Sequence, residues 1–303
     1  MLDPYLRLRL DGYVWPFLLI VFQTASTLLP WRIVVSVRTH RVASPILTDA
    51  EDSTVEQIAP THIAILAMLI FGAAVLYSSV GHAGASGYLA AMALFSVAPE
   101  VMKPTALILN IAVALITTVR FYRAGYFSWP LLSPFVVSSV PLAFIGGAIT
   151  LPGTVYRVLV GLILLFAAYR LFWYTDREKT TQPPHVIAAL VLGAVLGFVS
   201  GLTGVGGGIF LSPLLLFMGW ANFKQTAGAS SVFILLNSLA GLAGHVSSVQ
   251  SVPHAAFVWA VAAAVGGLVG SEMGVRRLAE VTLRRLLAAV LVVAGVKLIL
   301  TRR

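Results

Sequence analysis

The chain has 303 residues, of which 59% are hydrophobic and only 10% are charged, and its mean hydropathy is +0.94. Soluble globular proteins carry about 25% charged residues, so this composition excludes a soluble fold and indicates an integral membrane protein with several spans. The formal net charge of +9 does not indicate nucleic-acid binding, because the lysines and arginines are scattered between apolar runs, as the positive-inside rule requires. No cysteine is present, which excludes disulfides and thiol chemistry.

Apolar runs of roughly 17 to 25 residues, the length that crosses a bilayer as a helix, recur along the chain. They are continuous and do not alternate, so we expect helices and not barrel strands. Residues 1–60 form an N-terminal extension whose apolar stretch at 14–29 is either an extra span or an interfacial helix. The predicted helical segments that follow are 62–79, 86–98, 105–119, 129–150 and 155–173, then 186–202, 209–220, 227–246, 255–272 and 284–300.

The same order of features occurs twice at a constant offset of 123 residues. The paired positions are His62 with His185, Gly81 with Gly204, Gly84 with Gly207, and Pro130 with Pro253. Residues 61–174 therefore form a first transmembrane repeat and 186–303 a second, with a linker at 175–185. An odd number of segments per repeat orients the repeats oppositely, as in many secondary transporters. The expected fold is an all-α polytopic membrane protein with two inverted repeats of about five helical segments each, including short or re-entrant half-helices after glycine-rich loops.

Loop cations predict which ends of the segments face the cytoplasm. The richer side carries Arg120, Arg123, Arg177, Lys179, Lys224, Arg276, Arg277, Arg284 and Arg285. The other side carries Lys103 and Arg157, with Arg302 and Arg303 at the terminus. The richer side is therefore expected to be cytoplasmic.

Two glycine-rich stretches interrupt the apolar runs. Residues 200–213 read S-G-L-T-G-V-G-G-G-I-F-L-S-P, and residues 78–87 read S-S-V-G-H-A-G-A-S-G. A glycine turn at a helix start presents unpaired backbone amides at the positive end of the helix dipole, which can bind a sulfonate or carboxylate without a permanent charge in lipid. The alternative is that these glycines only allow close helix packing. Two turns at equivalent positions of a repeat favour the anion site.

These stretches also carry a family resemblance. V-S-G-L-T-G-V-G-G-G-I-F-L-S-P-L-L-L at 199–216, followed by K-Q-T-A-G-A-S-S-V-F-I-L-L-N-S-L-A-G-L-A-G-H at 224–245, resembles the second half of the sulfite exporter TauE/SafE family of membrane permeases. S-S-V-G-H-A-G-A-S-G-Y with P-E-V-M-K-P-T-A-L-I-L-N-I is similar to the family's first repeat. The likeness covers about residues 60–300. It implies two homologous halves and the transport of small anions that often contain sulfur, such as sulfite and sulfonates.

Polar side chains inside the apolar segments complete the predicted site, because a polar group in hydrocarbon is costly and usually faces a partner or a cavity. The expected substrate-binding residues are Gly81, His82, Gly84, Ser86, Asn110, Thr203, Gly204, Gly206, Gly207, Gly208, Thr226, Ser230, Ser231 and Asn237. We expect a transporter and not an enzyme, with no cofactor and no metal. Its expected partners are a small anion, membrane lipid and a coupling ion, H⁺ or Na⁺, because no nucleotide-binding motif is present.

Among the other charged and titratable residues, His82, Lys103 and Lys224 each have two interpretations. His82 either titrates and assists the anion or binds a carbonyl. Lys103 and Lys224 either attract the anion or extend toward the membrane surface. We expect Glu272 to pair with Arg276 one turn later on the same helix. The other histidines are expected at the ends of spans: His62, His185 and His254 as anchors and His245 at the interface.

Two competing functions remain at this stage. One is a passive anion channel with the same fold. The other is an intramembrane serine protease, because G84-A-S-G87 matches the G-x-S-G motif of rhomboid proteases, with Ser86 as nucleophile and His245 as base. The protease hypothesis leaves the repeat and the second glycine stretch unexplained.

Overall fold

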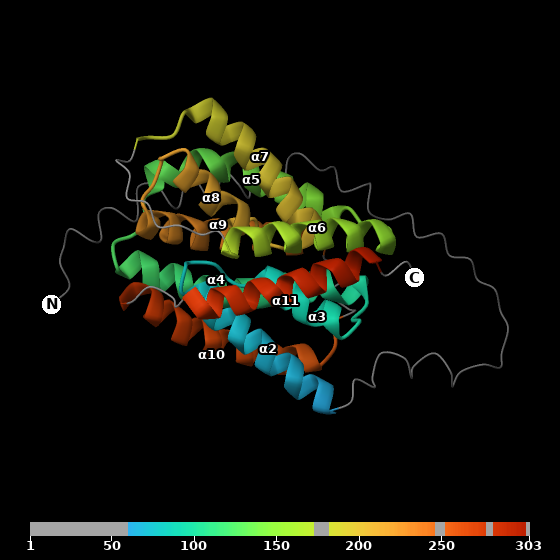
Figure 1. Ribbon diagram of the computed structural model, residues 1–303. Helices are drawn as coiled ribbons and strands as arrows, with labels where there is room; N and C mark the ends of the chain where they lie inside the picture. The colour runs from blue at the N-terminus through green and yellow to red at the C-terminus, as the bar shows by residue number, and fades with distance from the viewer. Residues whose placement is uncertain (1–59, 173–181, 246–251, 277–280, 301–303) are drawn as a thin grey trace. The chain divides into compact units, whose positions relative to one another are not determined.

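A computed structural model describes residues 60–172, 182–245, 252–276 and 281–300. They belong to the compact unit Asp52–Arg303, and all regular structure described within it is helical (Figure 1). Six helices of this described part are long and apolar enough to cross a membrane. The all-α membrane fold is therefore confirmed, whereas the apolar stretch at 14–29 and most of the linker at 175–185 lie outside the described residues.

The described residues form helices in an order that occurs twice: one long helix, one short helix and three long helices. The first set is α2 (Pro60–Ser78), α3 (Ala85–Leu94), α4 (Pro99–Arg123), α5 (Trp129–Ala148) and α6 (Gly153–Phe172). The second set is α7 (Val186–Thr203), α8 (Gly208–Phe217), α9 (Phe223–Gly244), α10 (Ala255–Arg276) and α11 (Val281–Leu300). Each predicted segment corresponds to one helix, and the two segments that follow the glycine stretches are the short ones, α3 and α8.

The helices α4 and α9 begin six and four residues before their predicted starts at 105 and 227. α4 begins at Pro99, since proline lacks only a backbone N–H that the first turn of a helix does not use, and it continues through Pro104. α9 begins at Phe223, one residue after Asn222. The Asn222 side chain accepts a hydrogen bond from the Gln225 amide at 2.9 Å, and the Gln225 side chain accepts one from the Asn222 amide at 3.1 Å.

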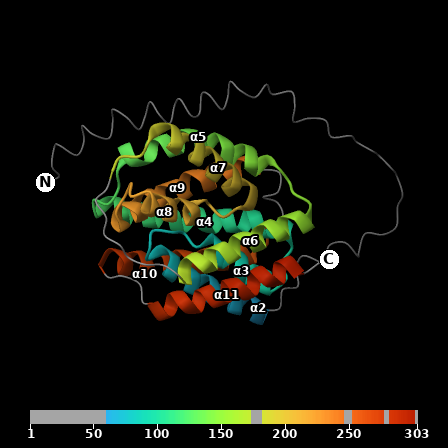
Figure 2. The ribbon, with the colours of Figure 1, turned by 45° about the horizontal axis from the view of Figure 1, so that its top comes forward.

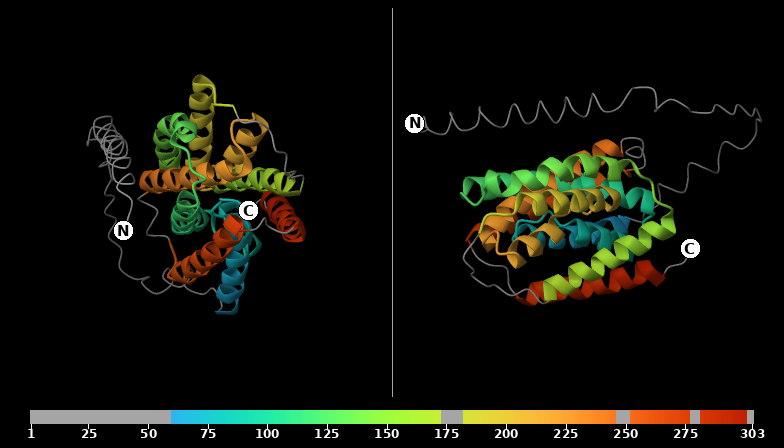
Figure 3. Two further views of the ribbon diagram at one scale, coloured as in Figure 1. Left: turned by 90° about the vertical axis from the view of Figure 1, so that its left-hand side faces the viewer. Right: turned by 90° about the horizontal axis from the view of Figure 1, so that it is seen from above.

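The main helix contacts join the first set of helices to the second. α5 packs along α7, α2 along α10, and α6 along α11, as further views show (Figures 2 and 3). α4 and α9 pack against each other, and each also contacts one of these pairs: α4 touches α10, and α9 touches α5. Helices α4 and α9 therefore lie between the α2–α10 pair and the α5–α7 pair.

Two rows of glycines bring the paired helices into backbone contact, and we call them the α7 glycine row and the α10 glycine row. A Cβ atom added at any of these glycines would overlap a carbonyl group of the partner helix. In the α7 row, Gly193, Gly197 and Gly201 face the carbonyls of Phe135, Ser139 and Ala143 on α5. In the α10 row, Gly266 and Gly270 face those of Phe71 and Val75 on α2, and Gly274 faces that of Ser79, directly after α2. At these positions the glycines do allow close helix packing.

Large apolar side chains cover the outer surface of the helices. Met68, Phe217 and Phe257 expose 73%, 83% and 76% of their surface, an arrangement that would be costly in water but suits contact with lipid tails. Inside, Tyr88, Trp259 and other large side chains are fully buried. The apolar exterior agrees with a membrane-embedded fold.

Candidate functional site

The first glycine turn, residues 80–84, joins α2 to α3. Gly81 has φ of +78° and Gly84 has φ of +107°, both in the left-handed region that favours glycine. A Cβ atom on Gly81 would overlap the backbone of Ala227 near the start of α9. The turn therefore lies directly against a helix of the second set.

Side-chain hydroxyl groups hold this turn between its two helices. Ser86, in the first turn of α3, donates a hydrogen bond to the Tyr77 hydroxyl oxygen on α2 at 2.6 Å. The Tyr88 hydroxyl group donates to the Ala83 carbonyl within the turn. Both tyrosines are buried. The turn is thus fixed by bonds from the helix before it and the helix after it.

The second glycine turn, residues 204–207, joins α7 to α8 and lies where α4 meets α9. Gly204, Gly206 and Gly207 have φ of +80°, +82° and +76°. A Cβ atom on Gly206 would lie only 2.7 Å from Asn110 Nδ2 and 3.2 Å from Ser238 Oγ. Glycine at 206 therefore lets the backbone approach two buried polar side chains, one from each central helix.

Neighbouring helices fix the second turn as well. The Tyr156 hydroxyl group on α6 donates a hydrogen bond to the Thr203 carbonyl at 3.1 Å, at the end of α7. In α8 the amides of Phe210 and Leu211 each donate to the Gly207 carbonyl at 3.1 Å. The amides of residues 206–209 precede them, and first-turn amides have no acceptor within their own helix. The amides of Gly208 and Ile209, in the first turn of α8, are therefore candidates for binding a ligand.

The two turns meet at His82. Its Nε2 atom lies 3.0 Å from the Gly208 carbonyl oxygen, at the first residue of α8, and its Nδ1 atom lies 3.1 Å from the Val80 carbonyl oxygen. Ser212 Oγ lies 3.1 Å from the same Nε2 atom and 2.6 Å from Ser230 Oγ on α9. A continuous polar chain therefore runs from the first turn through α8 to α9.

A second polar contact connects the two central helices beside the second turn. Asn110 on α4 donates from Nδ2 to Ser238 Oγ on α9 at 3.4 Å, and both residues are fully buried. This contact and the chain from His82 both border Ile234, whose side chain lies against Gly206 and Gly208.

Several buried polar atoms on or near α4 and α9 have no hydrogen-bond partner among the described residues. They are Thr105 Oγ1, Asn110 Oδ1, Thr118 Oγ1, Ser139 Oγ, Ser200 Oγ, Thr226 Oγ1 and Asn237 Oδ1. Buried polar atoms in native proteins are nearly always bonded, so such a group points to a bound water, ion or ligand.

The structure brings some of the predicted residues together. His82, Gly208 and Ser230 belong to one polar chain, and Asn110 contacts Gly206. Gly81, Gly84, Gly204 and Gly207 form the bends of the two turns. Thr226 is buried at the start of α9, next to the residue that Gly81 contacts.

Other predicted residues bond within their own helix or its neighbour. Thr203 donates to the Val199 carbonyl at 2.7 Å, Ser231 to the Gly228 carbonyl at 2.9 Å, and Asn237 to the Phe233 carbonyl at 2.8 Å. Such bonds are the usual state of polar side chains in membrane helices. Ser86 has the Tyr77 contact described above.

Sequence reasoning missed Ser212 and omitted Ser238 from the predicted site. Ser212 follows Gly208 by one helical turn, so it lies on the same face of α8, and that spacing could have indicated it. Ser238 directly follows Asn237, but only the packing of α4 against α9 selects it as the residue that faces Asn110. Tyr156 carries no local signal, because its partner is 47 positions away.

Lys103 does not extend toward the membrane surface. Its side chain is only 4% exposed, and Nζ donates hydrogen bonds to the carbonyls of Gly147 at 2.9 Å and Ile149 at 3.1 Å. It therefore caps the end of α5, where free carbonyls and the negative end of the helix dipole attract a cation. Lys224 is exposed, and its ammonium group lies 4.9 Å from the centre of the Tyr126 ring.

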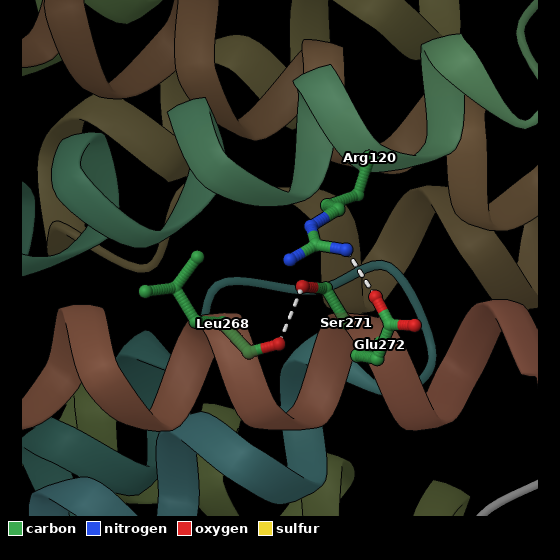
Figure 4. Close-up of polar contacts among 4 residues, drawn as sticks. All are labelled: Arg120, Leu268, Ser271 and Glu272. Carbon is green, nitrogen blue, oxygen red and sulfur yellow. Dashed lines mark hydrogen bonds and ion pairs between the residues drawn. The ribbon is translucent and has the colours of Figure 1, made fainter.

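An ion pair connects α4 to α10. Arg120 Nη1 contacts Glu272 Oε2, and the Ser271 hydroxyl group beside it donates to the Leu268 carbonyl at 3.2 Å (Figure 4). We had assigned Glu272 to Arg276, whose side chain lies outside the described residues. The observed pair places the C-terminal ends of α4 and α10 next to each other.

The remaining histidines do not enter the glycine turns. His62, His185 and His254 are exposed at helix starts. His245, directly after α9, is buried, and its Nδ1 atom lies 3.1 Å from the Gly147 carbonyl oxygen. Burial and, to a lesser extent, the Lys103 ammonium group lower the pKa of His245, so the neutral ring donates from Nδ1 to that carbonyl.

The structure does not form the serine protease pair. Ser86 donates to Tyr77, while His245 contacts Gly147 at the end of α5. A nucleophile needs its base within hydrogen-bond reach. Within the described residues, no group of three or more His, Cys, Asp or Glu side chains is arranged to hold a metal ion.

Comparison with known proteins agrees with these features. Residues 66–298 match the family model described as sulfite exporter TauE/SafE. The chain is 42% identical over 239 residues to y4hK, a probable membrane transporter protein of Sinorhizobium fredii (strain NBRC 101917 / NGR234), and the match covers 77% of this chain and 97% of that protein. It is 23% identical over 227 residues to YunE, a probable membrane transporter protein of Bacillus subtilis (strain 168), covering 67% and 82% of the two chains.

No solved structure matches the chain significantly. The family match covers both glycine turns and the helices that border them, and the described part of the chain has six helices able to span a membrane. The protein is a multi-pass membrane transporter protein that belongs to the sulfite exporter TauE/SafE family.

Proposed function

We propose that the protein is a secondary transporter of a small anion, sulfite or another sulfur oxyanion or organosulfonate, in a bacterial inner membrane. The observation that carries the proposal is the contact between His82 on the first glycine turn and Gly208 at the second, because it brings two helix N-termini to one place. The name of the matched family supports the substrate class. Alternating access between two inverted repeats is the mechanism that the repeated helix order favours.

Neutral donors can hold the anion in this site. The free amides at the start of α8, the Ser230 hydroxyl group and the Asn110 side-chain amide all lie near the second turn. Oxyanions accept several such hydrogen bonds, and each bond is strengthened by the charge of its acceptor. The unpartnered Thr226 Oγ1 and Asn237 Oδ1 atoms extend the polar surface along α9, where water can accompany the anion.

A passive channel of the same fold is the second candidate. It would use the same donors but would not alternate between two closed states. Within the described residues the second turn is buried among helices, whereas Val80 and His82 of the first turn are partly exposed, so an anion needs a conformational change to reach the second turn. That burial favours a carrier over an open pore.

The test is counterflow in proteoliposomes, with radiolabelled sulfite, thiosulfate, sulfoacetate or taurine outside and the same compound unlabelled inside. A carrier accumulates label transiently in exchange for internal substrate, whereas a channel equilibrates without such acceleration. We expect counterflow with at least one sulfur anion. Its absence with all four compounds, in protein that remains monodisperse, would contradict the proposal.

A glycine substitution tests whether transport depends on the second glycine turn. Gly206→Ala adds a Cβ atom 2.7 Å from Asn110 Nδ2, and we expect it to lower transport at least about tenfold. Gly125→Ala is the matched control, because Gly125 has a similar φ of +77° but nothing within 4 Å of the added atom. Both variants pay the same backbone strain, so only the contact differs. Equal transport by the two variants would remove the second turn from the site.

A further inference from the structure

We propose that His82 binds a proton that is transported together with the anion, so that the coupling ion is H⁺ and its binding site is the imidazole ring between the two glycine turns. This inference rests on the proposed anion transport and adds to it the coupling ion and the residue that holds it.

The ring has partners in both protonation states. Imidazolium has two N–H donors, whereas neutral imidazole has one donor and one acceptor nitrogen. Nδ1 faces the Val80 carbonyl, so it carries a hydrogen in either state. Nε2 faces both the Gly208 carbonyl, which only accepts, and the Ser212 hydroxyl group, which can donate. Protonated Nε2 donates to Gly208, and neutral Nε2 accepts from Ser212, with no movement of the ring.

Protonation also reverses the hydroxyl chain. When Nε2 is neutral, Ser230 donates to Ser212 and Ser212 donates to Nε2. When Nε2 binds a proton, Ser212 turns and donates to Ser230, 2.6 Å away, and the Ser230 hydrogen becomes free for an external acceptor. The Nε2 lone pair takes one proton from water and the ring gains one positive charge. A singly charged anion that accepts from Ser230 completes a neutral pair, which is less costly to bury than either ion alone.

Among the groups around His82, the ring itself is the one that gains this positive charge. Tyr77 on α2 faces it with ring centroids 6.3 Å apart, and Tyr88 on α3 bonds the turn at Ala83. The Ser212 hydroxyl group on α8 contacts the ring, and the Ser230 hydroxyl group on α9 contacts Ser212. Serine hydroxyl groups do not titrate near neutral pH.

Charged side chains of the described region are placed elsewhere. The two carboxylates there are Glu100, at the first turn of α4, and Glu272, which pairs with Arg120. The Lys103 ammonium group binds the carbonyls at the end of α5. Histidine is also the side chain whose ordinary pKa lies near neutrality; burial lowers the pKa of His82, while its contacts with the Val80 and Gly208 carbonyls raise it.

The experiment uses proteoliposomes that contain a trapped pH-sensitive dye, with thiosulfate and methanesulfonate as probes. Neither probe takes up a proton near neutral pH, so proton uptake that accompanies anion uptake comes from the protein. We expect the wild type to take up protons with the anion. We expect His82→Asn to lose at least about nine-tenths of the protons moved per anion that it still transports, whatever its rate of anion exchange.

His185→Asn is the matched control, because His185 is an exposed histidine at the start of α7, and its ratio of protons to anions should equal that of the wild type. Anion uptake without protons in the wild type, or an unchanged ratio in His82→Asn, would overturn the inference while leaving the proposed transport intact. Failure of the wild type to move either probe or sulfite would reject both proposals.

A second measurement applies if His82→Asn does not fold. The apparent affinity of wild type for methanesulfonate should rise by up to about tenfold for each unit of acidification, because proton and anion binding are linked. Ser212→Ala breaks the hydroxyl chain and should flatten this dependence. Because burial lowers the pKa of His82, the measurement extends to acidic pH, and an affinity that does not change between about pH 4.5 and 8.5 in the wild type would also overturn the inference.

Discussion

The ammonium group of Lys103, on α4, lies 2.9 Å from the carbonyl oxygen of Gly147, near the end of α5. The backbone of Lys103 lies against Gly204, so the same residue also contacts the second glycine turn. One residue thus connects the end of a long helix to a turn of the candidate site. Its charge stabilises α5, and the turn itself offers hydrogen-bond donors without a fixed positive charge.

Replacing Lys103 with methionine should destabilise the protein. The change removes charge-assisted hydrogen bonds to buried carbonyls, each worth about 1.5–3 kcal/mol, so the thermal midpoint in detergent should fall clearly. Lys224→Met is the control, because Lys224 is exposed and its ring contact is worth about 0.5–1 kcal/mol. A fall in anion affinity without a fall in stability would instead assign Lys103 to the substrate.

Asn110→Leu should separate function from stability. Asn110 is fully buried, its Oδ1 atom has no partner within the described residues, and its bond from Nδ2 to Ser238 is long at 3.4 Å, so an apolar side chain of similar size should change the unfolding free energy by no more than about 1 kcal/mol. If Asn110 binds the anion, the apparent affinity should weaken by about tenfold. Binding measured by scintillation proximity and a melting curve on the same sample give both quantities. Unchanged affinity would limit Asn110 to a structural role.

The glycine rows predict that the stability of the protein depends strongly on side-chain size at these positions. Gly197→Ala places a methyl group on the Ser139 carbonyl and should destabilise the protein by about 1–3 kcal/mol, seen as a lower thermal midpoint and less monodisperse protein. Gly72→Ala is the matched control, since it is also a helix glycine but has nothing within 4 Å of the added atom. It should be neutral or stabilise by up to about 1 kcal/mol. Equal loss in both variants would contradict close packing at α7.

The Arg120–Glu272 pair gives a prediction for topology. It places the C-terminal ends of α4 and α10 next to each other, and the loop cations predict that this side is cytoplasmic. Because the chain has no cysteine, single variants can be labelled directly with an impermeant maleimide. Arg123→Cys should react only in inside-out vesicles, and Thr154→Cys, at the start of α6, only in right-side-out vesicles. Labelling of both variants from one side would contradict the five-span order.

Much of the fold could be predicted because its signals are local. A run of apolar residues long enough to cross the bilayer identifies a span, and glycine interrupts it where the backbone must bend. These two signals placed all the described helices and both turns. The start of α4 was missed because Lys103 and Pro104 resemble a break in an apolar run, although Lys103 is buried by its contacts with α5.

The side-chain partners of the site could not be predicted in the same way. Lys103 and Gly147 are 44 positions apart, and Arg120 and Glu272 are 152 apart, so only the packing of helices decides these contacts. Ser212 shows the same limit, because a serine in an apolar helix usually bonds its own backbone. Its contact with His82 exists because the first turn lies against α8.

The α7 and α10 glycine rows make each set of helices depend on the other set for its folding. Each row packs a helix of the first set against a helix of the second set, backbone to backbone, so neither set buries these glycines by itself. A fragment that ends in the linker would leave α5 without α7, and its counterpart would leave α10 without α2. We therefore expect the two fragments to be degraded when made separately and to assemble when made together, with insertion of the second set of helices completing the fold of the first.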